Sequence, residues 1–208
     1  MKNERGSKSL EEWVDEWRKK DLRELNPSTI HAIKRCLLDT LGVIEKGSTY
    51  SNMPPIKEVI HSTGSSYAFG FKNLESSDAA LWNGTAAHSV ELDDFYREGS
   101  VHPGVVVVPA ALAVGQEINA SGIEILTSIL IGYEVMSRVG MSAKGTIYNR
   151  GFHPTSVCGV YGAAAASAYL YQLPKKQVRM SFGIAGNYSF GLMAYKSNGA
   201  WTKRLNAG

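Results

Sequence analysis

The stretch VVVVPAALAVGQEI, residues 105–118, decides between a helical fold and one that contains a sheet. Its valines suit a strand, since β-branched residues are enriched in strands. The continuation PAALAVGQE, residues 109–117, suits a helix, and we predict a helix over the whole stretch. Elsewhere, residues 67–71, YAFGF, are the one convincing strand-like run, in a small hairpin or an extended connection. The sequence therefore predicts an all-α (mainly α) fold.

The remaining segments carry helix signals: apolar residues at helical spacing, capping side chains, and prolines or glycines at the ends. We predict helices over residues 9–20, from Asn26-Pro27 to Gly47, from Pro54-Pro55 to about Gly64, from Ser76 or Ser77 toward His88, from the Ser121–Glu124 capping box through the apolar run 123–139, over residues 155–173, and over residues 175–190. Residues 140–152 are expected to form a loop, and residues 1–8 to be disordered.

The composition is that of an ordinary globular protein. Hydrophobic residues make up 44% and charged residues 20% of the 208 residues, which is enough to bury a proper core. The formal net charge is +3, and the lysines and arginines are scattered rather than striped. Nucleic-acid binding is therefore unsupported, and the basic excess fits an anionic small molecule equally well.

The cysteines and the hydropathy of the chain argue against several other classes of protein. Cys36 and Cys158 lack CxxC spacing, so neither a disulfide framework nor a zinc knuckle is expected, and two thiols are too few for a cubane iron–sulfur cluster. The apolar run 123–139 is interrupted by polar residues and is interpreted as a buried helix, not a membrane span. The N-terminus is charged and lacks the apolar core of a signal peptide. We therefore expect a cytoplasmic protein that does not bind membranes.

The polar stretch NGTAAHSVELDDFYREGSVHPG, residues 83–104, lies between apolar runs and is either a solvated loop or a site. It ends in one His-Pro pair, His102-Pro103, and a second pair, His153-Pro154, follows later. Each proline is expected in the first turn of a helix, where the partial positive charge attracts anions and disfavours a protonated imidazole. Each histidine could bind a carboxylate or act as a general base, although a capping role is the alternative. Two such pairs beside an acidic loop and a distant lysine favour the functional interpretation.

The same stretch contains three neighbouring carboxylates, Glu91, Asp93 and Asp94. Crowding raises the pKa of a carboxyl group, which suits a general acid or base. Carboxylates of this kind also form hard-oxygen metal sites. A solvated helix end is the third interpretation, and from the residues alone all three stay open.

Candidate cations lie further along the chain. Lys203 and Arg204 could neutralise a substrate carboxylate or a developing enolate, although spacing alone favours a surface pair. Arg138, near the end of the apolar helix, is another candidate anion ligand, and a snorkelled surface arginine is its alternative interpretation.

Together these fragments resemble the MmgE/PrpD family, which includes 2-methylcitrate dehydratase, cis-aconitate decarboxylase and iminodisuccinate epimerase. The resemblance is carried by NGTAAHSVELDDF at 83–95, HPGVVVVPAALAVGQE at 102–117, GYEVMSR at 132–138, GFHPTSVCGVYGAAAASAYL at 151–170 and TKRLNAG at 202–208. It covers nearly the whole chain from about residue 10, and several separate motifs in the right order make it specific at family level. It does not choose among the reactions of the family.

The resemblance implies a large all-α domain, followed in typical members by a smaller α+β lid domain, and usually a homodimer. It implies chemistry on a small di- or tricarboxylate with no cofactor, neither an iron–sulfur cluster nor a metal. Carried over by position, the catalytic residues are Glu91, where decarboxylase-like members have Asp, together with His102, His153 and Lys203. The residues expected to bind the substrate are Asp94, Arg138 and Arg204.

Typical members of the family are longer, so residues 1–208 are expected to form an incomplete helical domain without the lid. The favoured function is a lyase of dehydratase or decarboxylase type that removes a proton next to a carboxylate, with 2-methylcitrate as an example substrate. The alternatives are an epimerase of the same family and an inactive truncated helical module that serves dimerisation. A metal-dependent hydrolase that uses His88, Asp93, Asp94 and His102 is a weaker rival.

Overall fold

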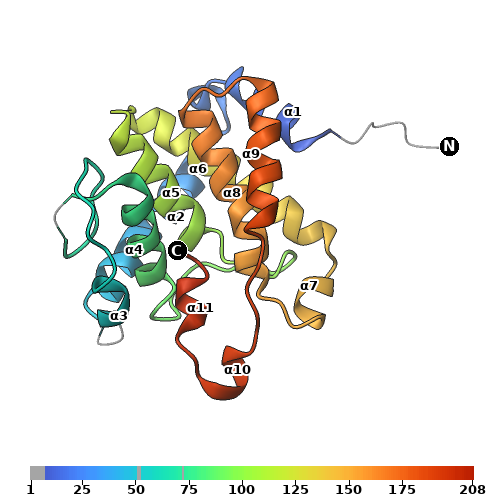
Figure 1. Ribbon diagram of the computed structural model, residues 1–208. Coiled ribbons are helices and arrows are strands. Elements are labelled where there is room, and N and C mark those ends of the chain that lie inside the picture. Colours follow the sequence, from blue (N-terminus) through green and yellow to red (C-terminus); the bar gives the residue numbers. More distant parts are fainter. Residues whose placement is uncertain (1–7, 51–52, 72) are drawn as a thin grey trace.

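The computed structural model describes residues 8–50, 53–71 and 73–208, and over this part of the chain helices follow one another without a sheet (Figure 1). The elements are α1 (Leu10–Arg18), η1 (Leu22–Glu24), α2 (Pro27–Ser48), α3 (Pro54–Lys57), α4 (Ser76–Ala87), α5 (Gly104–Glu117), α6 (Gly122–Ser142), α7 (Thr146–Asn149), α8 (Pro154–Leu170), α9 (Lys175–Asn187), α10 (Tyr195–Asn198) and α11 (Thr202–Leu205). The predicted all-α class is confirmed. The disorder expected for residues 1–8 falls, apart from Lys8, outside the described residues.

Most predicted helix starts are confirmed, and at Asn26 and Ser121 the capping side chain acts as expected, whereas Glu75 and not a serine precedes α4. The Asn26 side chain accepts a hydrogen bond of 3.0 Å from the Ser28 amide, and α2 begins at Pro27. Ser121 and Glu124 form the capping box that opens α6. The valine-rich run lies within α5, which begins at Gly104, so the helix predicted there is confirmed and no strand is formed.

Of the two alternatives expected for residues 67–71, a hairpin or an extended connection, no regular strand is formed, and the run lies next to an isolated antiparallel bridge that pairs Ser66 with Leu74. The backbone of this run pairs with a side chain instead of a second strand. The Asn83 amide accepts from the Phe69 amide at 3.2 Å and donates to the Tyr67 carbonyl at 2.9 Å. One buried asparagine thereby satisfies the polar backbone that a neighbouring strand would otherwise satisfy.

Two predicted boundaries also differ from the structure. The helix that begins at Pro54 ends at Lys57, well short of Gly64, and the chain continues without regular structure while Ile60 is buried. The loop expected over residues 140–152 is partly helical, because α6 extends to Ser142 and α7 follows Gly145. Gly145 has a φ of 79°, a conformation that glycine adopts without strain, and this turn separates the two helices.

The centre of the molecule is formed by α5, α6 and α8, with the most extensive contact between α6 and α8. Small residues let these helices approach closely. A Cβ added at Gly132 on α6 would lie 3.0 Å from the Gly162 carbonyl oxygen on α8. A Cβ added at Gly162 would lie 3.0 Å from the Gly132 carbonyl oxygen. The starts of α5 and α8 follow His102 and His153, so this packing fixes both histidines relative to each other.

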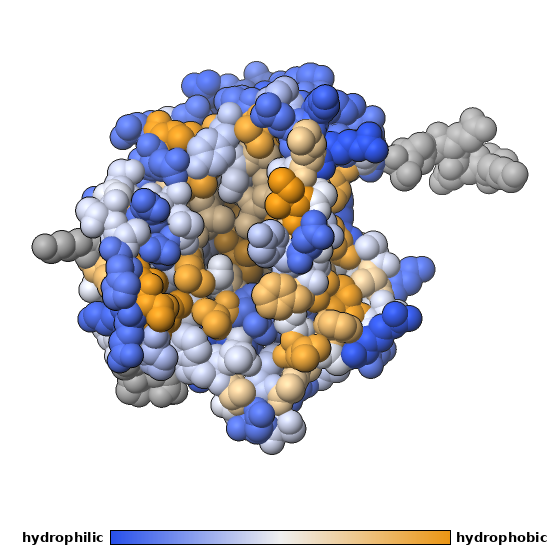
Figure 2. Space-filling model, viewed as in Figure 1, coloured by the Kyte–Doolittle hydropathy of each residue, from blue (hydrophilic) through white to orange (hydrophobic). Residues whose placement is uncertain are grey.

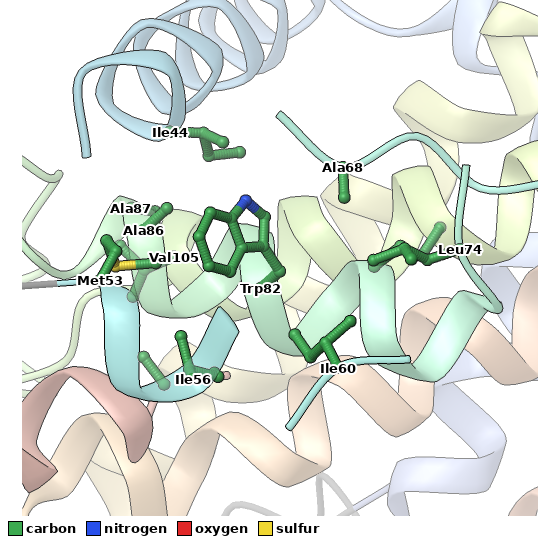
Figure 3. Close-up of a cluster of buried hydrophobic side chains, with 13 residues drawn as sticks. Ile44, Met53, Ile56, Ile60, Ala68, Leu74, Trp82, Ala86, Ala87 and Val105 are labelled. Atoms are coloured by element: carbon green, nitrogen blue, oxygen red, sulfur yellow. The ribbon is translucent and has the colours of Figure 1, made fainter. Parts of the chain in front are cut away.

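A second core surrounds Trp82 of α4 (Figure 3). Figure 3 shows Ile44, Ile56 and Ile60 around the indole ring, and the indole N–H donates to the Phe69 carbonyl at 2.7 Å. This core holds α4 against α2. Because α4 ends directly before His88, the core also sets the position of the polar stretch that follows.

Hydrophobic side chains remain exposed on α9 and on the segment after it. They are Met180, Ile184, Tyr188, Phe190 and Leu192. Figure 2 shows hydrophobic residues on this face of the molecule, gathered between hydrophilic ones. Within the described residues, none of the helices combines the length and the apolar character that crossing a membrane requires.

Candidate active site

Asp93 lies between two imidazoles at the centre of the candidate site. Its Oδ2 accepts a hydrogen bond of 2.7 Å from Nδ1 of His88, the buried residue directly after α4. Nδ1 of His102 lies 2.9 Å from the same oxygen, at a poorer angle for a hydrogen bond. The Asp93 side chain is only 4% exposed. Because an ionised carboxylate only accepts hydrogen bonds, His88 carries its proton on Nδ1.

His153 brings a third imidazole to the same place. It precedes Pro154, the first residue of α8, and its backbone amide donates to the Gly191 carbonyl at 2.8 Å. Its ring stacks on His88 with centroids 5.4 Å apart, and the rings of His88 and His102 are 5.2 Å apart. The packing of α4, α5 and α8 thus gathers three histidines that are far apart in the sequence.

Lys203 on α11 supplies a positive charge beside these histidines. Its ammonium group forms an ion pair with the Glu91 carboxylate. The Lys203 side chain is 18% exposed, whereas that of Glu91 is 61% exposed. Glu91 has a φ of 55°, a left-handed conformation that is uncommon for a residue with a side chain. The turn at Glu91 and its ion pair therefore support each other.

A cavity of about 330 Å³ opens onto this group of residues. His102, His153, Lys196 and Lys203 all line it, and no aspartate or glutamate of the described chain does. Its aromatic lining residues are Phe95, Tyr148 and Tyr195. Its volume is in the range of small-molecule sites, and its lining carries positive charge without a carboxylate. The cavity therefore suits a small anion.

The three histidines differ in pKa, because burial and the Asp93 carboxylate affect each of them to a different extent. Burial lowers the pKa of His153 to about 3, with a further contribution from the nearby His88 and Lys203. Burial also lowers the pKa of His88, and the hydrogen bond to Asp93 does not offset it. His88 and His153 are therefore neutral at pH 7.

His102 differs from the other two histidines. Burial favours its neutral form, but the Asp93 carboxylate outweighs burial and raises the pKa of His102 above its usual value. Burial opposes ionisation of Asp93, and the two neighbouring imidazoles nevertheless hold the pKa of Asp93 far below its usual value. An ionised Asp93 thus favours a proton on His102, which can act as an acid or as a charged hydrogen-bond donor.

Asp94 does not line the cavity and contacts the start of α5. Its Oδ1 accepts from the Gly104 amide at 2.9 Å, and its Oδ2 accepts from the Tyr133 hydroxyl at 2.9 Å. Burial raises the pKa of Asp94, and these two hydrogen bonds partly offset the increase. This geometry gives Asp94 a structural contact where the sequence suggested substrate binding.

The two arginines expected to bind substrate also lie outside the cavity lining. The Arg138 guanidinium lies 4.0 Å from the centroid of the Trp13 ring and pairs with Glu134 one turn earlier on α6. Nε of Arg204 donates to the Ser89 carbonyl at 3.4 Å. Arg204 therefore holds the chain next to His88, whereas Arg138 belongs to the contact between α1 and α6.

Comparison with known proteins assigns the chain to a family. The model of the MmgE/PrpD N-terminal domain matches residues 8–208. The chain belongs to the MmgE/PrpD family. Cis-aconitate decarboxylase of Homo sapiens is 30% identical over 194 residues, which cover 88% of this chain and 40% of the relative. The cis-aconitate decarboxylase-like protein oryM of Aspergillus oryzae is 33% identical over 129 residues, which cover 58% and 27%.

A third relative, cis-aconitate decarboxylase of Mus musculus, is 29% identical over 178 residues, which cover 81% of this chain and 36% of the relative. The matched region thus spans between 27% and 40% of the length of these curated relatives. The resemblance that the sequence motifs indicated is confirmed at the level of the family.

One group of side chains in this MmgE/PrpD domain has the composition of a metal site. His88, Asp93 and His102 each offer a ligand atom, and these atoms lie within 4.8 Å of one another. Both Nδ1 atoms, however, approach one carboxylate oxygen at 2.7 and 2.9 Å. Ligands that each bond a zinc ion at about 2.0–2.2 Å in tetrahedral geometry stand further apart from one another. As placed, the group fits hydrogen bonding and not metal ligation, which weakens the hydrolase alternative.

Several residues of the site in this MmgE/PrpD domain were not among the residues expected from the sequence. His88 was considered only as a metal ligand, and Asp93 as one of three crowded carboxylates that suit a general acid or base or a metal site, although both belong to the polar stretch that also holds His102. Tyr148 and Lys196 line the cavity but carry no motif or spacing that could have marked them. The sequence thus marked the polar stretch as a candidate site, but it carried no signal for Tyr148 and Lys196.

Proposed function

We propose that this domain supplies the polar face of the active site of a lyase that acts on a small di- or tricarboxylate. The observation that carries the proposal is that His102, His153 and Lys203, from three separate segments, line one cavity of about 330 Å³. The relatives named cis-aconitate decarboxylase support a substrate of this class. An unsaturated or hydroxylated tricarboxylate, such as cis-aconitate or 2-methylcitrate, is the expected size.

Lys203 is proposed to bind the carboxylate next to the reacting carbon. An ammonium group at this position also stabilises the enolate-like charge that develops when that carbon loses its proton. Lys203 is paired with Glu91, so a substrate carboxylate would share or replace that contact. The buried His153, which stays neutral, would accept or donate a hydrogen bond to the substrate without adding charge.

His102 is proposed as the general acid, and Glu91, which does not line the cavity but contacts the lining residue Lys203, as the base. His102 retains a proton because of Asp93, and contact of its Nδ1 with Asp93 leaves Nε2 available to act. In a dehydration, Glu91 takes the proton from the carbon next to the carboxylate, and that electron pair forms the double bond. The hydroxyl group leaves as water with the proton from His102. General acid and base residues of this kind contribute about 10²–10⁴-fold each.

The test is turnover of cis-aconitate and 2-methylcitrate followed by proton NMR. We expect the wild-type chain to consume at least one of them, and His102→Gln and His153→Gln each to lower the rate by at least about 100-fold. His31→Gln is the matched control, because His31 is exposed on α2 and does not line the cavity. Undiminished turnover in both site variants would remove the proposed mechanism.

The epimerase alternative within the family makes a different prediction in the same assay. In D₂O an epimerase exchanges the proton next to the carboxylate for deuterium while the substrate keeps all its carboxylates and hydroxyls. Loss of water or carbon dioxide would instead support the lyase. The deuterium label therefore separates the two reactions in a single spectrum.

The second candidate function is a dimerisation module without activity. The exposed hydrophobic side chains of α9, among them Met180 and Ile184, favour it because they offer a surface for association. We also propose a homodimer for the lyase, so light scattering alone does not separate the two. Calorimetry does, because the inactive module is expected to bind no polycarboxylate.

A further inference from the structure

A second ammonium group lines the same cavity as Lys203. It belongs to Lys196 on α10, a residue that neither a motif nor the family resemblance singled out. Its Nζ donates a hydrogen bond to the Tyr148 hydroxyl and lies 4.5 Å from the centroid of the Tyr148 ring. Tyr148 belongs to α7, which is 48 residues earlier in the chain. The contact therefore joins two short helices across one wall of the cavity.

The two ammonium groups differ in their charge environment. Lys203 is paired with Glu91, whereas Lys196 has no carboxylate within 4.0 Å among the residues that the structure describes. The partner of Lys196 is a neutral phenol, which leaves its charge uncompensated and further N–H groups free to donate. An anion that enters the cavity can therefore gain a charge-assisted hydrogen bond from Lys196.

The helix that carries Lys196 is also tied to the histidines. Tyr195 precedes Lys196 on α10, and its ring packs edge-on against the His153 ring with centroids 5.6 Å apart. Burial raises the pKa of Tyr195 to about 12, so the phenol adds no negative charge to the cavity. The position of Lys196 is thus fixed on one side by Tyr148 and on the other by the contact of Tyr195 with His153.

We propose that Lys196, held by Tyr148, binds a second carboxylate of the ligand whose first carboxylate is bound at Lys203. The ligand would then span the cavity, and Lys196 would make the site select di- and tricarboxylates over monocarboxylates. The inference rests on the proposed function, because it assumes that the cavity binds a polycarboxylate. It assigns to Lys196 and Tyr148 a role in specificity and none in the chemical step.

The experiment measures the affinity of the chain for two probes at low ionic strength, where exposed charges are least screened. Tricarballylate, a saturated tricarboxylate, is titrated by calorimetry, and butyrate, a monocarboxylate, by NMR. Lys196→Met removes the charge but keeps the length of the side chain, and Tyr148→Phe removes only the hydroxyl. Lys176→Met is the matched control, since Lys176 is an exposed lysine of α9 that does not line the cavity.

We expect Lys196→Met to weaken tricarballylate binding about tenfold, the usual size of a lost charge-assisted hydrogen bond. Tyr148→Phe should weaken it by a smaller factor, and butyrate binding should stay unchanged in both variants. Unchanged tricarballylate binding in both variants, with normal binding by the wild type, would overturn the role of Lys196 alone. A wild-type chain that binds neither probe would overturn the proposed function together with this inference. Circular dichroism melts show whether each variant is folded.

Discussion

The ammonium group of Lys203 and the carboxylate of Glu91 form an ion pair although 112 residues separate them in the sequence. The pair joins α11 to the turn after α4, where Glu91 has a left-handed backbone conformation. Glu91 thus occupies the contact that a substrate carboxylate is proposed to take. Glu91 and a bound anion therefore compete for one cation.

This competition predicts that Glu91→Gln tightens the binding of tricarballylate. Since the ion pair is partly exposed, its removal should strengthen tricarballylate binding by about 0.2–1 kcal/mol, which lowers the dissociation constant by up to about fivefold. Calorimetry measures the change. Glu98→Gln is the control, because Glu98 is an exposed glutamate of the same segment that does not line the cavity. Weaker binding by Glu91→Gln would show that Glu91 assists the ligand.

Asp93→Asn should lower the pKa of His102. The charge of the Asp93 carboxylate, 2.9 Å from Nδ1 of His102, is what raises that pKa, and an amide of the same shape carries no charge. NMR titration of the imidazole resonances measures the pKa directly. Asp39→Asn, at an exposed position on α2, should leave it unchanged. If the pKa of His102 did not move in Asp93→Asn, Asp93 would have only a packing role.

The stability of the protein should fall as the pH falls from 6.5 to 5.0. Folded His153 has a pKa of about 3, so in this window only the unfolded chain takes up its proton. Protonation of the unfolded state lowers the free energy of unfolding by at most about 1.4 kcal/mol per pH unit, and by about half of that at pH 6.5, which amounts to roughly 1–2 kcal/mol over the window. His88, whose pKa is also lowered, acts in the same direction.

Urea denaturation at the two pH values measures this difference, and His153→Gln should remove the part that His153 contributes. His102 acts weakly in the opposite direction in this window, because its pKa is raised in the folded chain and its stabilising contribution is complete only once the unfolded imidazole is also protonated at pH 5. Its contribution is present below the unfolded pKa and is lost only as the pH rises through the folded pKa. A wild-type protein with equal stability at both pH values would contradict a neutral, buried His153.

Gly47→Ala and Gly42→Ala should change stability in opposite directions, although both lie on α2. A Cβ at Gly47 would lie 1.9 Å from the Ala86 carbonyl oxygen on α4, so the helices must separate. We expect a loss of about 1–3 kcal/mol. A Cβ at Gly42 meets no atom within 4 Å, and the better helix former should add about 0.5–1 kcal/mol. Urea midpoints test both, and equal effects would mean that α2 and α4 are not closely packed.

The sequence by itself determined most of the longer helices and the beginning of the site. Asn26 and Ser121 cap their helices as expected, because a cap satisfies backbone N–H groups within a few residues along the chain. The His-Pro pairs at 102 and 153 marked helix starts for another local reason, because proline has a helix-like φ and no N–H group that needs a partner. Such features need no knowledge of packing.

Tertiary structure decided which side chains meet. It paired Asn83 with the run that was expected to be a strand, Glu91 with Lys203, and Tyr148 with Lys196. It also placed Asp93 against both His88 and His102, and Arg138 outside the cavity. These contacts depend on how closely α2, α4, α5, α6 and α8 approach, which is set by glycines and buried side chains on different helices. Local hydrogen-bond patterns fix each helix, but only the packing between helices fixes the cavity and its charge.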